Sequence, residues 1–260
     1  MNIVRPMSKR GPSKQVQQGV RPLGRVSGRR AIFTRSEKSG GTPAVEDPVE
    51  RVVAIWADLD PMVAALSCQP FKLDLRGGQL LTTQEQVAEF RKKLGVVAGE
   101  WLYTPDFQAV IHVARVLILE AKSDKFPGDQ AYTAKLQLVS KLLSERGMSF
   151  ARIVLPSDPG HGLINNAPLL RLAKSRQDEL PSPAVLDRLT SLAEQADIGL
   201  GELLDAASLP INIAPLLFVH GVIGADLSQR ISRRMPVYAA HGSLDHLSVL
   251  GFHNYVPKRS

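Results

Sequence analysis

Two carboxylates and one ammonium group lie in a short stretch of the chain. Asp106 follows a proline, and a single residue, Ala121, separates Glu120 from Lys122. On a β-strand Glu120 and Lys122 project from the same face, and a neighbouring strand can bring Asp106 beside them. Hard divalent cations such as Mg²⁺ prefer oxygen ligands, often one or two carboxylates. We therefore expect Asp106, Glu120 and the main-chain carbonyl of Ala121 to bind Mg²⁺, with Mn²⁺ as a substitute.

The chemistry expected from this set is metal-assisted hydrolysis of a phosphate ester. Lys122 would orient the attacking water or help to deprotonate it, while the metal ion stabilises the charge that builds on the phosphate. The same spacing also occurs in solvated cross-strand ion pairs, which is the alternative interpretation of Glu120 and Lys122. The apolar residues 116–119 favour the metal site, because a charge at the end of a buried strand requires a partner.

The residues around this motif predict the elements that must position it. Residues 101–113 and 116–122 are β-branched and aromatic runs, too close together for a crossover, and they predict an antiparallel hairpin. Helices are expected over 49–59, about 83–94 and 129–146, and further strands over 71–75 and 150–155. This order of elements predicts an α/β fold with a mixed sheet flanked by helices.

Composition divides the chain into three expected parts. Residues 1–45 are basic and rich in Gly, Pro and Ser, and predict a flexible arm. Residues 46–178 hold the motif and its elements. Residues 179–260 contain short helix candidates followed by two short extended runs, and predict a helical, winged-helix-like domain that binds DNA or a partner protein.

The net charge of +7 is concentrated in the arm, which carries nine Lys and Arg residues and no acid up to residue 35. A polyanion is the natural partner of such a segment, and contacts with DNA phosphates would weaken as salt rises. The residues expected to contact DNA are Arg21, Arg25, Arg29 and Arg30, together with Lys125 after the hairpin. The alternative function of the arm is that of a solubilising tail.

Several classes of protein are not expected from the sequence. No run of about 18 uncharged apolar residues is present, so a membrane-spanning helix is not expected. The start lacks the apolar region of a secretory signal, and the single cysteine, Cys68, suits a reducing cytoplasm as a small buried residue. No phosphate-binding Gly-x-x-x-x-Gly-Lys motif occurs, so any use of ATP would belong to another subunit.

A longer series of short motifs extends the pattern around the hairpin. In chain order these are Glu50-Arg51, Leu59-Asp60-Pro61-Met62-Val63, Gln69-Pro70, Tyr103-Thr104-Pro105-Asp106-Phe107, Leu119-Glu120-Ala121-Lys122, Arg146-Gly147-Met148-Ser149-Phe150 and Asn165-Asn166-Ala167-Pro168-Leu169-Leu170. The series resembles the TnsA-like endonuclease subunits of heteromeric, cut-and-paste transposases, which belong to the PD-(D/E)xK nucleases. It covers about residues 50–172, nearly half of the chain.

The resemblance implies a restriction-endonuclease-like fold and a specific activity. Such subunits are metal-dependent DNA endonucleases that cleave the non-transferred strand at the 5′ ends of a transposon. An integrase-type transposase subunit makes the 3′ cuts and joins strands, and an ATP-dependent (AAA+) regulator completes the assembly. The resemblance therefore implies double-stranded transposon ends as the substrate and a DNA-associated protein of the bacterial cytoplasm.

The resemblance also adds a residue to the expected site. Glu50 matches the helix glutamate of the family, Asp106 the hairpin aspartate, and Glu120 and Lys122 the last two active-site positions. Glu50 would then be a third metal-binding carboxylate. Its alternative interpretation is structural, because acidic residues near a helix N-terminus interact favourably with the helix dipole.

Two other functions remain compatible with these residues. The first is a free-standing restriction or repair nuclease of the PD-(D/E)xK superfamily. The second is a non-catalytic DNA-binding scaffold, in which the basic arm and the C-terminal domain bind DNA and the acidic cluster is structural.

Overall fold

The structure is a computed structural model that describes residues 16–17, 19–20, 32–34, 36–112, 115–194 and 198–255. The arm residues expected to contact DNA, Arg21, Arg25, Arg29 and Arg30, lie outside the described residues.

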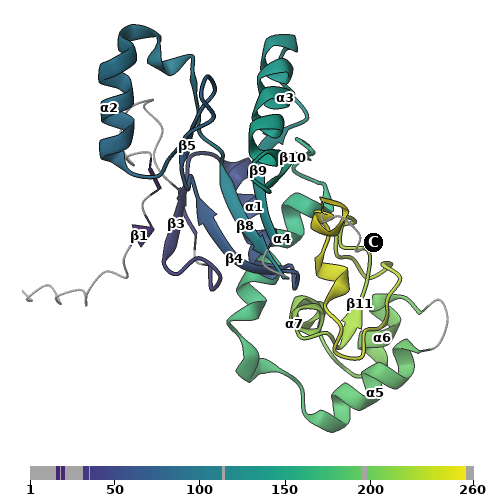
Figure 1. The fold of residues 1–260 in the computed structure, drawn as a ribbon. Helices are drawn as coiled ribbons and strands as arrows, with labels where there is room; N and C mark the ends of the chain where they lie inside the picture. Colours follow the sequence, from purple (N-terminus) through teal and green to yellow (C-terminus); the bar gives the residue numbers. More distant parts are fainter. Residues whose placement is uncertain are drawn as a thin grey trace, which may run out of the picture.

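A four-stranded mixed sheet forms the centre of the molecule, with strand order β10-β9-β8-β4 (Figure 1). Its strands are β4 (Val63–Cys68), β8 (Phe107–Ile111), β9 (Arg115–Ser123) and β10 (Ser149–Leu155). Strands β8 and β9 form the expected antiparallel hairpin, whereas β9 and β10 are parallel. The helix α3 (Gln130–Ser144) makes the crossover that a parallel pair requires. The expected mixed sheet flanked by helices is thus confirmed.

The two faces of β9 pack against different helices. Leu117 and Leu119 lie in a buried cluster with Val53 of helix α1 (Pro48–Leu59). Ile118, between them in the chain, instead packs in a cluster that contains Leu136 of α3. This alternation follows from the two-residue period of a strand. Glu120 and Lys122 therefore continue the face that is directed toward α3.

The expected long strand over 101–113 is in fact two strands in two sheets. Residues Leu102–Tyr103 form β7, which pairs with β5 (Lys72–Asp74) in a small sheet of order β6-β5-β7, whereas β8 pairs with β9. The strand β6 (Leu80–Leu81), the helix α2 (Gln84–Leu94) and the short 3-10 helix η1 (Gly95–Gly99) complete this insertion. Pro105 lies at the break, where it cannot donate a ladder hydrogen bond. The chain changes partner immediately before Asp106.

The C-terminal half consists mainly of short helices. These are α4 (Gly162–Lys174), η2 (Gln177–Glu179), α5 (Pro183–Ala193), α6 (Leu200–Ala206), η3 (Ile211–Ile213), α7 (Ala214–Val219), η4 (Asp245–Leu247) and η5 (Phe252–Tyr255). The short strands β11 (Ile223–Gly224) and β12 (Tyr238–Ala239) form an antiparallel ladder between α7 and η4. The helix α4 was not expected from the sequence, because Pro168 lies inside it.

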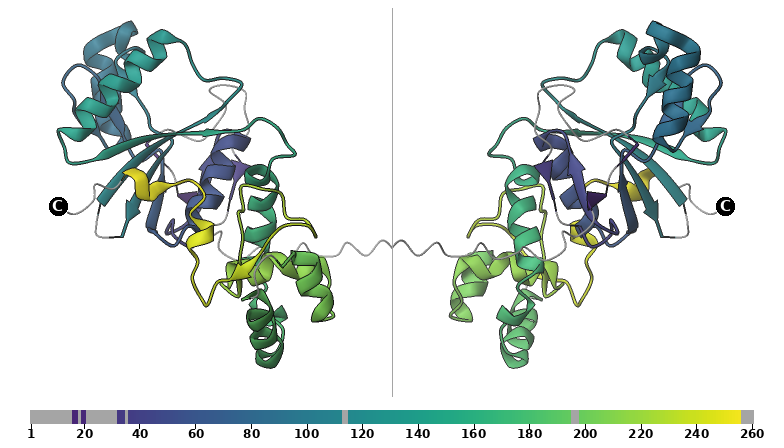
Figure 2. Two further views of the ribbon diagram at one scale, coloured as in Figure 1. Left: turned by 90° about the vertical axis from the view of Figure 1, so that its right-hand side faces the viewer. Right: turned by 90° about the vertical axis from the view of Figure 1, so that its left-hand side faces the viewer.

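The expected boundary near residue 178 does not separate two cores. Ile55 and Trp56 of α1 share a buried cluster with Leu170 of α4 and with helices α5 to α7. Phe252, near the C-terminus, is fully buried in the core of the central sheet, beside which the yellow C-terminal segment runs in Figure 2. The two expected domains are therefore packed together through α1 and α4.

Among the described residues, no single helix has the length and apolar character needed to cross a membrane. One strongly bent pair, α6 with the segment Ile211–Val219, passes that test only when its two helices are taken together.

Part of the expected flexible arm is packed on the core. Its described residues include β1 (Val16–Gln17), β2 (Ile32–Phe33) and β3 (Thr42–Val45), which form a small sheet of order β1-β3-β2. Val45 is buried against Val53 and Ala57 of α1. The expectation that residues 1–45 form a free arm is thus corrected for β2 and β3, because Val45 and Ile32 pack in the apolar cluster that contains residues of α1.

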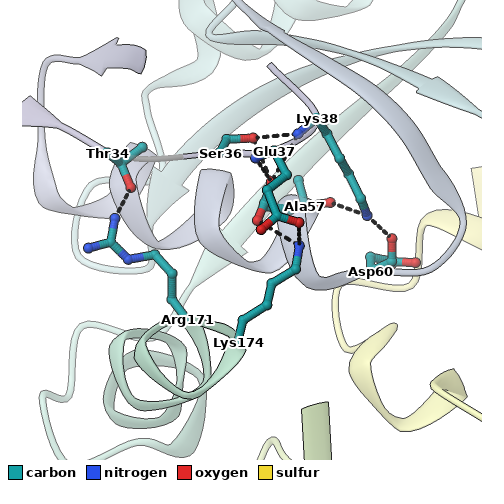
Figure 3. A network of polar contacts seen from close by, with 9 residues as sticks. Thr34, Ser36, Glu37, Lys38, Ala57, Asp60, Arg171 and Lys174 are labelled. Atoms are coloured by element: carbon teal, nitrogen blue, oxygen red, sulfur yellow. Dashed lines mark hydrogen bonds and ion pairs between the residues drawn. The ribbon is translucent and has the colours of Figure 1, made fainter. Parts of the chain in front are cut away.

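The contacts of one buried aspartate join the segment between β2 and β3 to helices α1 and α4 (Figure 3). Asp58 of α1 accepts hydrogen bonds from the Ser36 hydroxyl at 2.6 Å and from the Glu37 N–H at 2.8 Å. Its second oxygen lies 3.3 Å from the Lys174 ammonium of α4. Beside it, Arg171 of α4 donates to the Thr34 hydroxyl at 2.7 Å. We refer to these contacts of Asp58 as the Asp58 clasp.

Replacing Asp58 by alanine is expected to destabilise the protein by about 1 to 3 kcal/mol at pH 7, because buried donors lose their acceptor. Burial opposes ionisation of Asp58, but the hydrogen bond from Ser36 and the Lys174 ammonium outweigh it and lower its pKa. A lowered folded-state pKa gives stability that is complete above the unfolded-state pKa, about 3.9, and is lost as pH falls through the folded-state value. The difference in the free energy of unfolding between variant and wild type, measured with urea, should therefore become smaller below about pH 4.

The control is Asp205→Ala, which removes an exposed ion pair with Arg233 and should cost less than about 1 kcal/mol. An equal loss of unfolding free energy in the two variants would show that the Asp58 clasp contributes no more to stability than an exposed ion pair.

Candidate active site

The end of the β8–β9 hairpin places Asp106 beside β9. Phe107, the first residue of β8, pairs with Leu119, so β9 continues beyond the start of its partner. Ala121 lies beyond the start of β8, and its N–H donates a hydrogen bond to Oδ2 of Asp106 at 2.8 Å. The N–H and C=O of one strand residue point to the same side. The Ala121 carbonyl is therefore directed toward the same open edge as Asp106.

Glu120 and Lys122 lie on one face of β9, as the sequence predicted. The Lys122 ammonium is 2.7 Å from Oε1 of Glu120, and the Glu120 side chain is almost fully buried. Two tyrosines also contact this carboxylate: Tyr103 of β7 donates to Oε2 at 2.5 Å, and Tyr132 of α3 donates to Oε1. The Lys122 ammonium also lies over the Tyr132 ring, 5.5 Å from its centroid.

Glu50 reaches the same region from α1. It lies in the first turn of the helix, whose N-cap Asp47 accepts a hydrogen bond from the Glu50 N–H at 2.9 Å. The Glu50 carboxylate is buried, and its Oε2 accepts from the Glu46 N–H at 2.7 Å. A carboxylate that served only the helix dipole could remain in solvent, whereas this one is buried, and its charge raises the pKa of Asp106.

The close approach of like charges is visible in the pKa values. Burial raises the pKa of Glu50 to about 7, and the neighbouring carboxylates of Asp47 and Glu46 add to the increase. Burial, followed by the carboxylates of Glu120 and Glu50, raises the pKa of Asp106 well above its ordinary value. Glu50 and Glu120 therefore both act on the charge of Asp106, and among the described residues Lys122 is a cation whose charge acts on both Glu50 and Asp106.

Lys122 is the cation of this cluster. Burial alone would lower its pKa, but the Glu120 carboxylate outweighs burial and raises the pKa above its ordinary value. Lys122 therefore remains an ammonium at neutral pH. Of the two roles expected from the sequence, orienting the attacking water fits this protonation state, and deprotonating it does not.

The cluster fits a hard divalent cation by charge and by donor type. Three ionised carboxylates and one ammonium leave two negative charges, and carboxylate and carbonyl oxygens are the ligands that Mg²⁺ and Mn²⁺ prefer. The ligands are not already gathered: within the described parts of the chain, no three His, Cys, Asp or Glu side chains form a ready metal-binding group. Binding would have to draw the carboxylates of Glu50, Asp106 and Glu120 together.

The remaining sequence expectations differ in outcome. Lys125 is exposed in the turn after β9 and is not part of the cluster. Cys68 is buried at the end of β4, as expected, and burial together with Glu50 and Asp106 raises its pKa to about 12. Tyr103 and Tyr132 were not identified as site residues, although Tyr103 stands in the quoted motif. Nothing in the spacing of Tyr132 indicates that α3 would bring it to Glu120.

Glu50→Gln is expected to stabilise the metal-free protein at pH 8 by about 1 to 3 kcal/mol, because it removes a buried charge. The folded-state pKa of about 7 exceeds the ordinary 4.5, so stability of the wild type falls as pH rises between these values. The gain should therefore be large at pH 8 and small at pH 4.5, as measured by urea unfolding in chelator. Glu89→Gln, on the exposed side of α2, is the control. A gain that does not change with pH would contradict the raised pKa.

Comparison with known proteins adds no relative to this description. No protein-family model matches the chain, and no curated protein matches it.

Proposed function

We propose that the chain is a metal-dependent DNA endonuclease. It would cleave the non-transferred strand at the 5′ ends of a transposon, as a subunit of a heteromeric transposase in the bacterial cytoplasm. The observation that carries the nuclease function is the hydrogen bond of Asp106 to the N–H of Ala121, the residue between the ion-paired Glu120 and Lys122, with the charge of Glu50 acting on Asp106. The transposase context is supported by the series of motifs over residues 50–172.

The reaction is hydrolysis of a phosphodiester. An oxygen of water forms the new bond to phosphorus while the bond to the 3′ oxygen breaks, which leaves a 3′ hydroxyl and a 5′ phosphate. Lys122, held by Glu120, orients the water and stabilises negative charge on the phosphate. Asp106 is fixed by the Ala121 N–H, so its second oxygen is available at the open edge.

Glu50, Asp106, Glu120 and the Ala121 carbonyl would hold the Mg²⁺ ion. When bound, the ion supplies Lewis-acid stabilisation of the phosphate and lowers the pKa of water. Glu50 and Asp106 have raised pKa values in its absence, so they give up protons when the ion binds. Double-stranded transposon ends, an integrase-type transposase and an AAA+ regulator are the proposed partners. Arg21, Arg25, Arg29, Arg30 and Lys125 are the proposed phosphate contacts.

Asp106→Ala and Lys122→Ala are each expected to reduce 5′-strand cleavage by at least about 100-fold, because they remove a metal ligand and the charge-stabilising ammonium. The measurement is strand-specific cleavage of labelled transposon-end DNA by the reconstituted complex with Mg²⁺. Cuts at the 3′ ends by the partner transposase should persist. The control is Lys141→Ala, at an exposed position of α3 that should leave both cuts unchanged.

The outcomes separate the three functions under consideration. Unchanged 5′ cuts in both variants would overturn the active site and favour a non-catalytic DNA-binding scaffold, for which the Glu120–Lys122 ion pair is structural. Cleavage of DNA without transposon ends and without a partner subunit would favour a free-standing nuclease.

Divalent cations should also stabilise the folded protein without DNA. A ligand that binds only the folded state at 100 times its Kd adds about 2.7 kcal/mol to the free energy of unfolding. We expect Mg²⁺ and Mn²⁺ to raise the thermal midpoint of the wild type and not that of Asp106→Ala. Equal shifts in both proteins, measured by calorimetry, would place the cation elsewhere.

A further inference from the structure

The Glu120 carboxylate is held on three sides by donors of the protein. Tyr103 donates to Oε2 at 2.5 Å, whereas Tyr132 donates to Oε1 and the Lys122 ammonium lies 2.7 Å from that same oxygen. An ionised carboxylate offers about four acceptor positions, two on each oxygen. The three donors therefore leave one position open, and it belongs to Oε2.

The two tyrosines come from different elements, and both are packed in place. Tyr103 is buried, lies opposite Leu73 in the β5–β7 ladder and meets the Phe150 ring edge to face at 6.4 Å. Tyr132 lies in the first turn of α3, where its N–H donates at 2.7 Å to the N-cap Asp129. The Tyr103 ring is buried, and the Tyr132 ring is partly buried against the same apolar cluster.

A glycine makes room for one of these rings. Gly128 has a φ of +85°, and a Cβ atom at this position would lie 2.4 Å from Cδ1 of Tyr132. Any other residue would be strained in this backbone conformation and would displace the Tyr132 ring. The turn before α3 is thus shaped to bring Tyr132 close to β9.

The hydroxyl groups are not needed for packing. A phenylalanine has the same ring and fills nearly the same volume, and Lys122 already supplies the charge that a buried carboxylate requires. The two hydroxyls fix the orientation of the Glu120 carboxylate, because each donates a hydrogen bond to one of its oxygens. Groups that hydrogen-bond a metal ligand in this way commonly set its orientation and affect metal affinity by 10- to 100-fold.

We propose that Tyr103 and Tyr132 are positioning residues, which hold Glu120 so that one lone pair of Oε2 is presented to the divalent cation. This role rests on the proposed metal-dependent function. The insertion that carries β7 and the helix α3 would each then act directly on the metal site.

The test measures Mn²⁺ binding to the full chain by isothermal titration calorimetry. Tyr103→Phe and Tyr132→Phe should each weaken Mn²⁺ binding by about tenfold, measured at a temperature at which circular dichroism shows that each variant is folded. Gly128→Ala should weaken binding in the same direction, because it displaces the Tyr132 ring. Tyr238→Phe, at a half-exposed tyrosine of β12, is the matched control and should bind like the wild type. In a Glu120→Gln background, the two tyrosine substitutions should have no further effect.

A second readout does not require metal. The carboxyl carbon-13 resonance of Glu120, assigned by its loss in Glu120→Gln, should shift in Tyr103→Phe and Tyr132→Phe but not in Tyr238→Phe. Unchanged or tighter Mn²⁺ binding in the two Phe variants would overturn the positioning role while leaving the metal site intact. If the wild type binds no Mn²⁺, the metal-dependent function fails, and an unchanged Glu120 resonance would then overturn the positioning role separately.

Discussion

The register of the β8–β9 hairpin is the constraint on which the site depends. Phe107 pairs with Leu119, so Asp106 meets the backbone of Ala121 and both Glu120 and Lys122 face α3. A slip of one residue would send every side chain of β9 to the other face and place Glu120 against the apolar surface of α1. The buried alternation of Leu117, Ile118 and Leu119 makes such a slip costly. The same apolar residues that build the core therefore also position the charged ones.

The charged forms of two carboxyl groups at this hairpin end are disfavoured. Glu50 and Glu120 are buried, Asp106 is partly buried and its pKa is raised by the charges of both, and Lys122 is the one ammonium that the described cluster contains. The raised pKa values of Glu50 and Asp106 show that the charged forms are disfavoured, which is a cost that packing alone does not explain. Perturbed carboxylates of this kind are typical of functional sites, although structural ion pairs also produce them. A divalent cation would remove the cost, because its charge equals the excess of the cluster.

Helix α1 connects this site to the rest of the molecule. Its first turn carries Glu50, its middle packs on both the central sheet and the C-terminal helices, and its last turn carries Asp58. The Asp58 clasp joins the described N-terminal segment to α4, so this segment, the central sheet and the C-terminal helices all contact α1.

The sequence by itself determined the local elements and the chemistry of the hairpin. Periodicity predicted α1, α3, β9 and β10, and the spacing of Glu120 and Lys122 predicted their shared face, because both depend only on residues near in the chain. Strand β4, helix α4 and the division of 101–113 into two strands were not predicted, since they depend on partners distant in sequence. The tertiary structure alone decided that Glu50 approaches Asp106, that the N-terminal segment packs on α1, and that two tyrosines hold Glu120. Contacts between distant segments follow from how the elements pack, and the spacing of residues near in the chain does not predict that packing.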